Sequence, residues 1–171
     1  NQWTSIFSIL WNKNPYFNEL FEKLVNVFEN INFENTVYAP FDVVLRDKGM
    51  ILDVKQLKGI LNDDSNPVDL CLPNDEHKSI GICQLSAITA ELKLPVAEHI
   101  GEEKEFLKST DLLDFPGARG RLQLGQEHID SDSCPDMFLR GKISYLFNKY
   151  SADYEINNLL FCMHDAQLEV N

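Results

Sequence analysis

The predicted fold depends most on the stretch Phe106-Leu107-Lys108-Ser109-Thr110-Asp111-Leu112-Leu113-Asp114-Phe115-Pro116-Gly117. Its apolar residues predict a mostly extended segment, and the Pro-Gly pair closes it. Working outward, the alternation of apolar and polar residues predicts a strand at 90–96, and a helix is expected at about 135–150. The apolar run at 156–163 has the length of a further strand. This order of strands, loop, helix and strand suits one half of a three-layer α/β sheet.

The residues before position 67 are predicted to form a helical subdomain. Asn14 and Pro15 mark a helix that runs to about residue 30, since Asn caps helix N-termini and Pro is favoured at the first helical position. A short apolar stripe precedes this helix and consists of Ile6, Ile9 and Leu10. The other elements expected here are an extended segment, a helical turn and a short helix, at residues 36–39, 41–45 and 53–61.

A β-hairpin is predicted in the middle of the chain. Residues 68–72 alternate apolar and polar side chains, residues 78–82 form the second arm, and the turn-forming residues 73–76 join the two. A short helical link at 85–90 follows. We therefore expect two parts, a helical insertion subdomain at 1–66 and a partial α/β region at 67–171.

Composition and charge limit the classes of function. The chain has 171 residues, of which 44% are hydrophobic, enough for the core of one domain. Its net charge of −12 opposes binding to nucleic acids and to anionic membranes. No window reaches the ~18–20 apolar residues of a membrane span, and we expect a soluble cytoplasmic protein. The first residue is Asn rather than Met, and we expect further sequence upstream.

Cysteines and histidines form no recognisable metal-binding motif in the sequence. No two cysteines have metal-ligand spacing, and no histidine pairs with another at helical spacing. Two disulfides are possible in principle, but reduced and mostly buried thiols are the favoured interpretation. The residues concerned are Cys71, Cys83, Cys134 and Cys162, and His77, His99, His128 and His164.

One motif carries chemistry, the Asp-x-x-Gly sequence from Asp114 to Gly117. In P-loop GTPases a buried strand brings this carboxylate to the Mg²⁺ shell, usually through water, and the glycine N–H approaches the γ-phosphate because no Cβ intervenes. The sequence thus makes Asp114 a candidate magnesium-side residue and Gly117 a candidate phosphate-binding residue of switch II. The alternative is a plain turn that closes a strand, since Pro-Gly is a common turn dipeptide.

The other GTPase motifs are missing from this sequence. A phosphate loop requires Gly-x-x-x-x-Gly-Lys-Ser/Thr, but the only Gly-Lys pair, Gly141-Lys142, lies in a predicted helix and is followed by Ile143. The guanine-reading Asn-Lys-x-Asp sequence is also missing, because both Asn-Lys pairs lack the aspartate. We therefore expect this chain alone neither to bind nor to hydrolyse GTP or ATP.

Several segments together resemble a known family. In chain order they are Leu10-Trp11 with Pro15, Val37–Phe41, Ile51–Gly59, Ala90–Pro95, Asp111–Arg119 and Leu139–Tyr150. This run resembles the bacterial virulence factor family of SrfC-like proteins, whose longer members look like dynamin-related P-loop GTPases. The resemblance implies that the chain is an internal piece, with Mg²⁺ and GTP bound only by the parent protein. It also implies Arg119 as a candidate switch contact, with an ordinary solvated loop charge as the alternative.

Two functions of different classes stay open. The first is a piece of a dynamin-like GTP-binding protein. The second is a non-enzymatic interaction or assembly domain of a bacterial effector or toxin-complex protein, in which Asp-x-Pro-Gly is only a turn. A hydrolase built on His164-Asp165 is disfavoured, because adjacent strand residues point to opposite faces. Protein partners are expected, either in the bacterial cytoplasm or after export as an effector.

Overall fold

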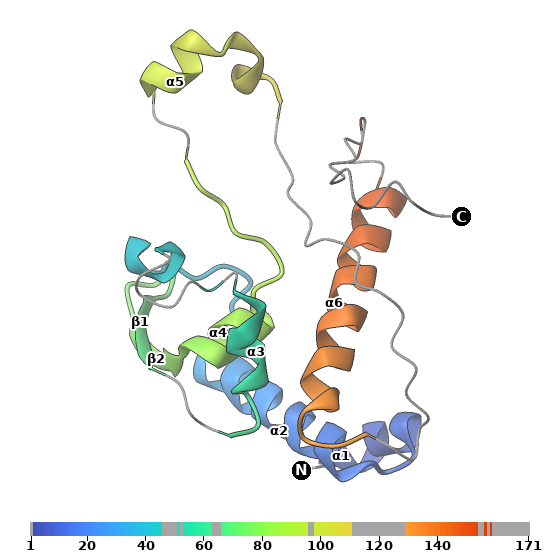
Figure 1. Cartoon of the computed structure of the whole chain (residues 1–171). Coiled ribbons are helices and arrows are strands. Elements are labelled where there is room, and N and C mark those ends of the chain that lie inside the picture. The colour runs from blue at the N-terminus through green and yellow to red at the C-terminus, as the bar shows by residue number, and fades with distance from the viewer. Residues whose placement is uncertain are drawn as a thin grey trace, which may run out of the picture.

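The computed structural model describes residues 2–45, 51, 53–62, 66–95, 98–110, 129–153, 156 and 158. This part of the chain is mainly helical and contains one two-stranded sheet (Figure 1). Its elements in order are α1 (Gln2–Phe7), η1 (Ser8–Trp11), α2 (Pro15–Asn30), η2 (Phe41–Val44), α3 (Val54–Lys58), β1 (Pro67–Cys71), β2 (His77–Gly81), α4 (Ile82–Ile88), α5 (Glu98–Glu103), η4 (Glu105–Lys108) and α6 (Ser133–Ala152).

Helix α2 begins as the sequence predicts. The Asn14 side-chain oxygen accepts hydrogen bonds from the N–H groups of Tyr16 and Phe17, at 3.0 and 3.2 Å, and Pro15 occupies the first helical position. These bonds satisfy two of the N–H groups that a helix start leaves without an intrahelical partner. Leu20 and Val27 then point into the core. The predicted helix and its cap are therefore confirmed.

The predicted hairpin is also confirmed. Strands β1 and β2 pair antiparallel, with Val68 opposite Ile80, and both side chains are buried. The far edge of β1 is partly covered, because Tyr38 and Cys71 exchange two backbone hydrogen bonds of 2.8 and 2.9 Å. The predicted extended segment around Tyr38 thus adds a one-residue bridge to the hairpin.

Helix α4 follows β2 directly and completes the core. Its first turn is fixed by the Gly81 N–H, which donates to the Gln84 side-chain oxygen at 2.9 Å. Helix α4 lies against α2, α3 and β2, so its buried side chains join three elements. The core residues with the least exposure include Leu20, Val27, Ile31, Leu57, Ile60, Leu70, Leu72, Ile80, Leu85, Cys134 and Leu139.

The long helix α6 confirms the helix predicted from Pro135 to Tyr150. Just before it, the Asp130 carboxylate accepts hydrogen bonds from the Ser133 hydroxyl at 2.7 Å and from the Ser133 N–H at 2.8 Å. These bonds also lower the pKa of Asp130. The N-terminal half of α6 buries Cys134 and Leu139 in the core, and the helix packs against α3.

Two predictions between the hairpin and α6 are wrong. Residues 90–95 run as an extended connection that pairs with no other strand in the described part, and Leu94 is exposed. Alternation alone makes no strand, because a strand also needs a partner edge for its backbone groups. The segment predicted to be extended from Phe106 instead begins with the short helix η4 at 105–108, which follows α5. Figure 1 shows α5 standing apart from the core.

Several predictions fall on residues outside the described ones. They are the segment at 111–115, the loop after it and most of the strand at 156–163. The three-layer sheet and the division at residue 66 therefore stay predictions.

Candidate interaction surface

The first helical segment of the chain is attached to α2 through aromatic rings. The Phe7 and Trp11 rings lie 5.2 and 5.7 Å from the Phe21 ring, and Trp11 also lies 6.0 Å from Phe17. The Trp11 ring N–H donates a 2.7 Å hydrogen bond to the Asn18 side chain. Such ring pairs contribute about 0.5–1.5 kcal/mol each beyond the area they bury. Segment α1–η1 is therefore a fixed part of the fold.

A tight turn after η1 strengthens this attachment. Asn12 and Lys13 both adopt left-handed backbone conformations, with φ of 50° and 57°. The Lys13 N–H donates to the Ser8 carbonyl at 2.7 Å, and the Asn14 N–H donates to the Trp11 carbonyl at 3.0 Å. A left-handed residue other than glycine costs of order 1 kcal/mol, so the surrounding contacts must hold this turn in place.

The side chains of α1–η1 are arranged opposite to those of an ordinary surface helix. The two small hydroxyl residues Thr4 and Ser8 are buried. Phe7 and Trp11 pack on α2, but four other large apolar residues point outward, with exposed fractions of 59% for Trp3, 59% for Ile6, 72% for Ile9 and 76% for Leu10. We call these four side chains the α1–η1 face. A contiguous apolar surface of this kind marks an interaction site more often than a single exposed leucine does.

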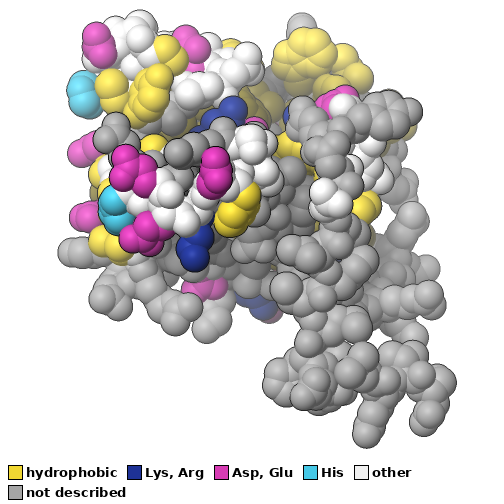
Figure 2. Space-filling view, turned by 90° about the horizontal axis from the view of Figure 1, so that it is seen from above, with side chains coloured by type: hydrophobic (Ala, Val, Ile, Leu, Met, Phe, Trp, Pro, Cys, Tyr) yellow, Lys and Arg dark blue, Asp and Glu magenta, His cyan; other side chains and the backbone are white. Residues whose placement is uncertain are grey.

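The α1–η1 face is also uncharged. Lys13 is the only charged residue among the first 18, although the whole chain has a net charge of −12. Elsewhere the described surface is acidic, and Figure 2 shows many acidic side chains with few Lys or Arg on the side seen from above. The described part therefore combines an acidic surface with a neutral apolar face at α1–η1.

The residues predicted to bind nucleotide lie outside the described ones. Asp114, Gly117 and Arg119 all fall in the range 111–128. Their predicted roles with Mg²⁺ and GTP therefore stay predictions. The Gly141-Lys142 pair is described, and it lies within α6 as the sequence predicts. It is therefore no part of a phosphate loop.

Lys142 joins two helices of the core. Its Nζ donates a 2.7 Å hydrogen bond to the Ser86 carbonyl near the C-terminal end of α4. The Ser86 hydroxyl in turn donates to the Ile51 carbonyl at 2.8 Å. Burial lowers the pKa of Lys142 to about 8. Because both partners are backbone carbonyls, the arrangement stabilises the contact of α6 with α4 and does not activate the serine.

The thiols and histidines form no metal centre in the described part. Cys71, Cys83 and Cys134 are reduced thiols, and burial raises the pKa of Cys134 to about 12, with a smaller contribution from Glu19. Such a thiol is inert rather than reactive. Among the described residues no group of three or more His, Cys, Asp or Glu side chains is placed to hold a metal ion.

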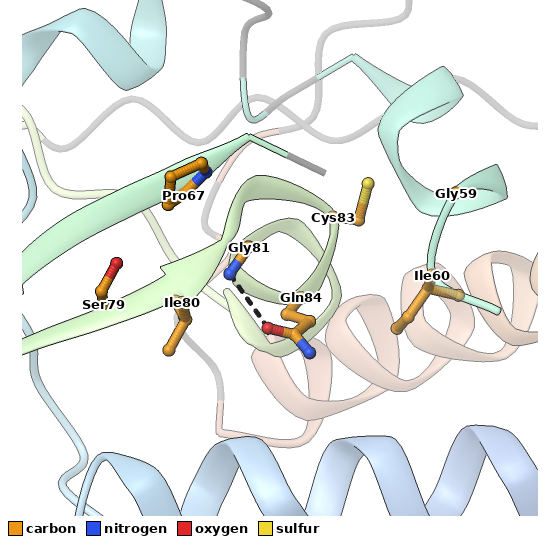
Figure 3. A pocket seen from close by; sticks show the side chains of 8 residues that line it. All are labelled: Gly59, Ile60, Pro67, Ser79, Ile80, Gly81, Cys83 and Gln84. Atoms are coloured by element: carbon orange, nitrogen blue, oxygen red, sulfur yellow. Dashed lines mark hydrogen bonds between the residues drawn. The ribbon is translucent and has the colours of Figure 1, made fainter. Parts of the chain in front are cut away.

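A shallow hollow of about 280 Å³ lies between the hairpin, the start of α4 and the end of α3. Figure 3 shows its lining, which contains no charged side chain, and the bond between Gly81 and Gln84 that closes one side. The Ser79 carbonyl at the strand edge accepts from the Asn30 side chain at 3.2 Å. The hollow therefore offers no acid–base pair. Its lining residues are Gly59, Ile60, Pro67, Ser79, Ile80, Gly81, Cys83 and Gln84.

The sequence located the segment of the α1–η1 face but not its role. The stripe of Ile6, Ile9 and Leu10 was visible, and a core-facing helix is the usual meaning of such a stripe. The signal that could have identified an exposed face is the pair of small hydroxyls at Thr4 and Ser8, one helical turn apart, together with the near absence of charge.

The described residues define a small, mainly helical domain with one hairpin, which presents an uncharged apolar face. The family described as "Putative bacterial virulence factor" matches the chain over residues 1–171, and the chain belongs to this family. The predicted virulence factor family is thereby confirmed, while its link to dynamin-related GTPases and the expectation of an internal piece stay predictions. No curated protein and no solved structure matches the chain. Within the described residues no helix is both long and apolar enough to span a membrane.

Proposed function

We propose that the chain acts as a protein-interaction region within its virulence-factor family. The α1–η1 face carries this proposal, because four large apolar side chains are held outward on a segment that is itself fixed to α2. Complete burial of an exposed Leu or Ile side chain contributes about 1.5–3 kcal/mol. A protein partner that covers this face would recover most of that free energy.

The acidic body and the composition of the face favour a protein over other ligands. The net charge of −12 opposes nucleic acid and anionic lipid. The hollow beside α4 supplies no acid–base pair, and Lys142 is engaged with a backbone carbonyl. A non-enzymatic binding role therefore fits the described residues best.

Site-specific photo-crosslinking tests this function. A photoreactive amino acid at position 9 in the natural protein should give ultraviolet-dependent protein adducts in bacterial cells. The same amino acid at position 93 is the matched control, since Lys93 is well exposed and lies outside the face. Adducts at position 9 but not at 93 are expected. A complete lack of protein adducts at position 9 would contradict an interaction role for this face.

A GTPase-like function is the second candidate, and the Asp114-Phe115-Pro116-Gly117 sequence favours it. In this proposal the chain is an internal piece of a dynamin-like P-loop protein. Asp114 contacts Mg²⁺ through water, the Gly117 N–H contacts the γ-phosphate, and Arg119 is a switch contact. The chain alone binds no nucleotide, because the phosphate loop lies elsewhere in the parent.

Nucleotide binding by the parent tests the second candidate. Mg²⁺-dependent binding of a fluorescent GTP analogue should be measured for the intact parent and for this chain, with GTP and ATP as competitors. Binding by the parent should be lost in Asp114→Ala and kept in Asp111→Ala, a matched aspartate three residues upstream. No binding by the intact parent would leave Asp114–Gly117 as a turn.

A further inference from the structure

We propose that the Lys93–Leu94 peptide bond is a processing site for a protease that cleaves after lysine, and that the two products stay assembled through α6. The proposal does not depend on the α1–η1 face, so its failure would leave the interaction function standing. Hydrolysis adds water across this bond and leaves a carboxylate on Lys93 and a protonated amino group on Leu94. The enzyme required is a serine protease with an acidic pocket for the lysine of its substrate.

The connection that contains this bond has the form that a protease binds. Residues 89–95 follow α4 without helix or strand, and residues 90–95 pair with no other strand in the described part. Figure 1 shows the connection leading from α4 to α5, away from the core. An extended peptide of this kind can add to a strand edge of another protein, which is a common mode of peptide binding. No described helix or strand has to open before this happens.

The side chains on both sides of the bond are accessible as well. The Lys93 side chain is 83% exposed, and its ion pair with Glu91 spans 3.6 Å. Such an exposed pair contributes little to stability, so Lys93 can leave it for an acidic pocket. Leu94 is 55% exposed. The two charged ends that hydrolysis produces would therefore lie in solvent and not in the core.

Secondary structure protects a comparable lysine elsewhere in the described part. Lys149 is also exposed, but it lies within α6, and its carbonyl accepts a 3.0 Å hydrogen bond from the Asp153 N–H. A helix has to open locally before its backbone can enter a protease, and this opening has a free-energy cost. The form of the backbone, rather than the exposure of the side chain, therefore distinguishes Lys93 from Lys149.

Helix α6 joins the two products across the cut. It follows the bond in the chain, yet Cys134 and Leu139 belong to a core whose other buried members lie within residues 20–87. A polar contact crosses the cut too, because Lys142 Nζ donates to the Ser86 carbonyl at 2.7 Å. Removal of α6 would expose the apolar side chains that it covers to water. The N-terminal product is therefore stabilised by keeping α6 in place.

The length of the connection indicates that these contacts, and not the covalent link, hold α6. Helix α4 ends at Ile88, and α6 begins at Ser133. A tether of this length gives α6 a local concentration of about 1 mM at most. A fold in which α6 is docked nearly all the time needs a dissociation constant roughly a hundredfold lower, near about 10 µM. The products should therefore stay paired at higher protein concentrations.

Timed digestion of the intact chain with a lysine-specific endoprotease tests the processing site. Mass spectrometry should show the Lys93–Leu94 bond cut at least about tenfold faster than the bond after Lys149, its matched control. Lys93→Gln should remove the fragments 1–93 and 94–171, which identifies them as products of this cut. A Lys93–Leu94 bond that is cut no faster than the bond after Lys149 would overturn the site.

Size-exclusion chromatography of the cut chain tests the assembly. At about 100 µM the two products should elute together at the position of the uncut chain and separate only in denaturant. Leu139→Ala, which shortens a buried side chain of α6, should weaken their association at least about tenfold. Tyr145→Ala is the matched control, because Tyr145 is 65% exposed on the same helix, and it should leave the association unchanged.

Far-UV circular dichroism of the uncut variants should match that of the unchanged chain, so that a difference after cutting arises from association. Products that separate without denaturant would overturn the assembly through α6. Equal affinities in Leu139→Ala and Tyr145→Ala would overturn it too, because the buried face of α6 would then not hold the pieces together.

Discussion

Segment α1–η1 and the hairpin with α4 use similar residues in opposite ways. In the hairpin, Val68 and Leu70 face the core while Asp69 between them is exposed. In α1–η1, Ile9 and Leu10 face outward while Ser8 is buried. An apolar stripe therefore marks a surface that is stabilised by burial, but the group that buries it need not be the core of the same domain.

The largest contrast should come from one leucine in each region. Leu70 is completely buried, so Leu70→Ala should lower the free energy of unfolding by about 2–5 kcal/mol. Leu10→Ala should change it by less than about 0.5 kcal/mol, because a largely exposed side chain contributes little to folding. Urea unfolding of dilute protein measures both values. Equal losses of unfolding free energy would show that Leu10 belongs to the core as Leu70 does, and that the two regions do not differ.

The helix start between the two regions should have the next largest effect. Asn14→Ala removes the side-chain oxygen that accepts from Tyr16 and Phe17, and should cost about 1 kcal/mol of unfolding free energy. Asn26→Ala, on an exposed face of the same helix, is the control and should change little. If both variants have the same stability, the cap does not stabilise the start of α2.

Local signals of this kind are what the sequence could predict. The Asn14-Pro15 pair gave the start of α2, and alternation with a turn at 73–76 gave the hairpin. The long helix α6 followed from its length and its apolar anchors. In each case the determining contacts lie within a few residues along the chain, so neighbouring residues were sufficient.

Other parts of the structure depend on contacts that a single sequence does not reveal. Residues 90–95 alternate like a strand, but strand formation requires a partner edge, which the described part does not provide. The outward direction of Ile9 and Leu10 depends on how Phe7 and Trp11 pack on α2. The candidate residues at 114–119 lie outside the described part, so their roles still rest on sequence.

Lys142, which joins α6 to the core, should make the free energy of unfolding depend on pH. The change between pH 8 and pH 9 should be below about 1 kcal/mol. The folded-state pKa of Lys142, about 8, lies below its ordinary value of 10.5, so the unfolded chain binds more protons between these values. Stability should therefore rise with pH from about 8 upward. Cys134 acts in the other direction, because its folded pKa of about 12 exceeds the ordinary 9.0 and stability is lost above about pH 9.

Chemical unfolding at pH 8 and pH 9 measures the Lys142 contribution to the unfolding free energy. Above this range the opposite effect of the Cys134 thiol dominates. The rise should disappear in Lys142→Met and persist in Lys149→Met, an exposed lysine of the same helix. A rise that survives in Lys142→Met would assign the effect to another group.

The smallest effect should come from the turn that holds the α1–η1 face. Lys13 has a φ of 57°, so Lys13→Gly relieves left-handed strain but makes the unfolded chain more flexible. These two effects nearly cancel, and the free energy of unfolding should change by less than about 0.5 kcal/mol. Lys13→Val should be the less stable variant, because a branched side chain is strongly disfavoured at positive φ. Equal stability of the Gly and Val variants would mean that this turn does not constrain the backbone, and the face would then be held by the Phe7 and Trp11 rings alone.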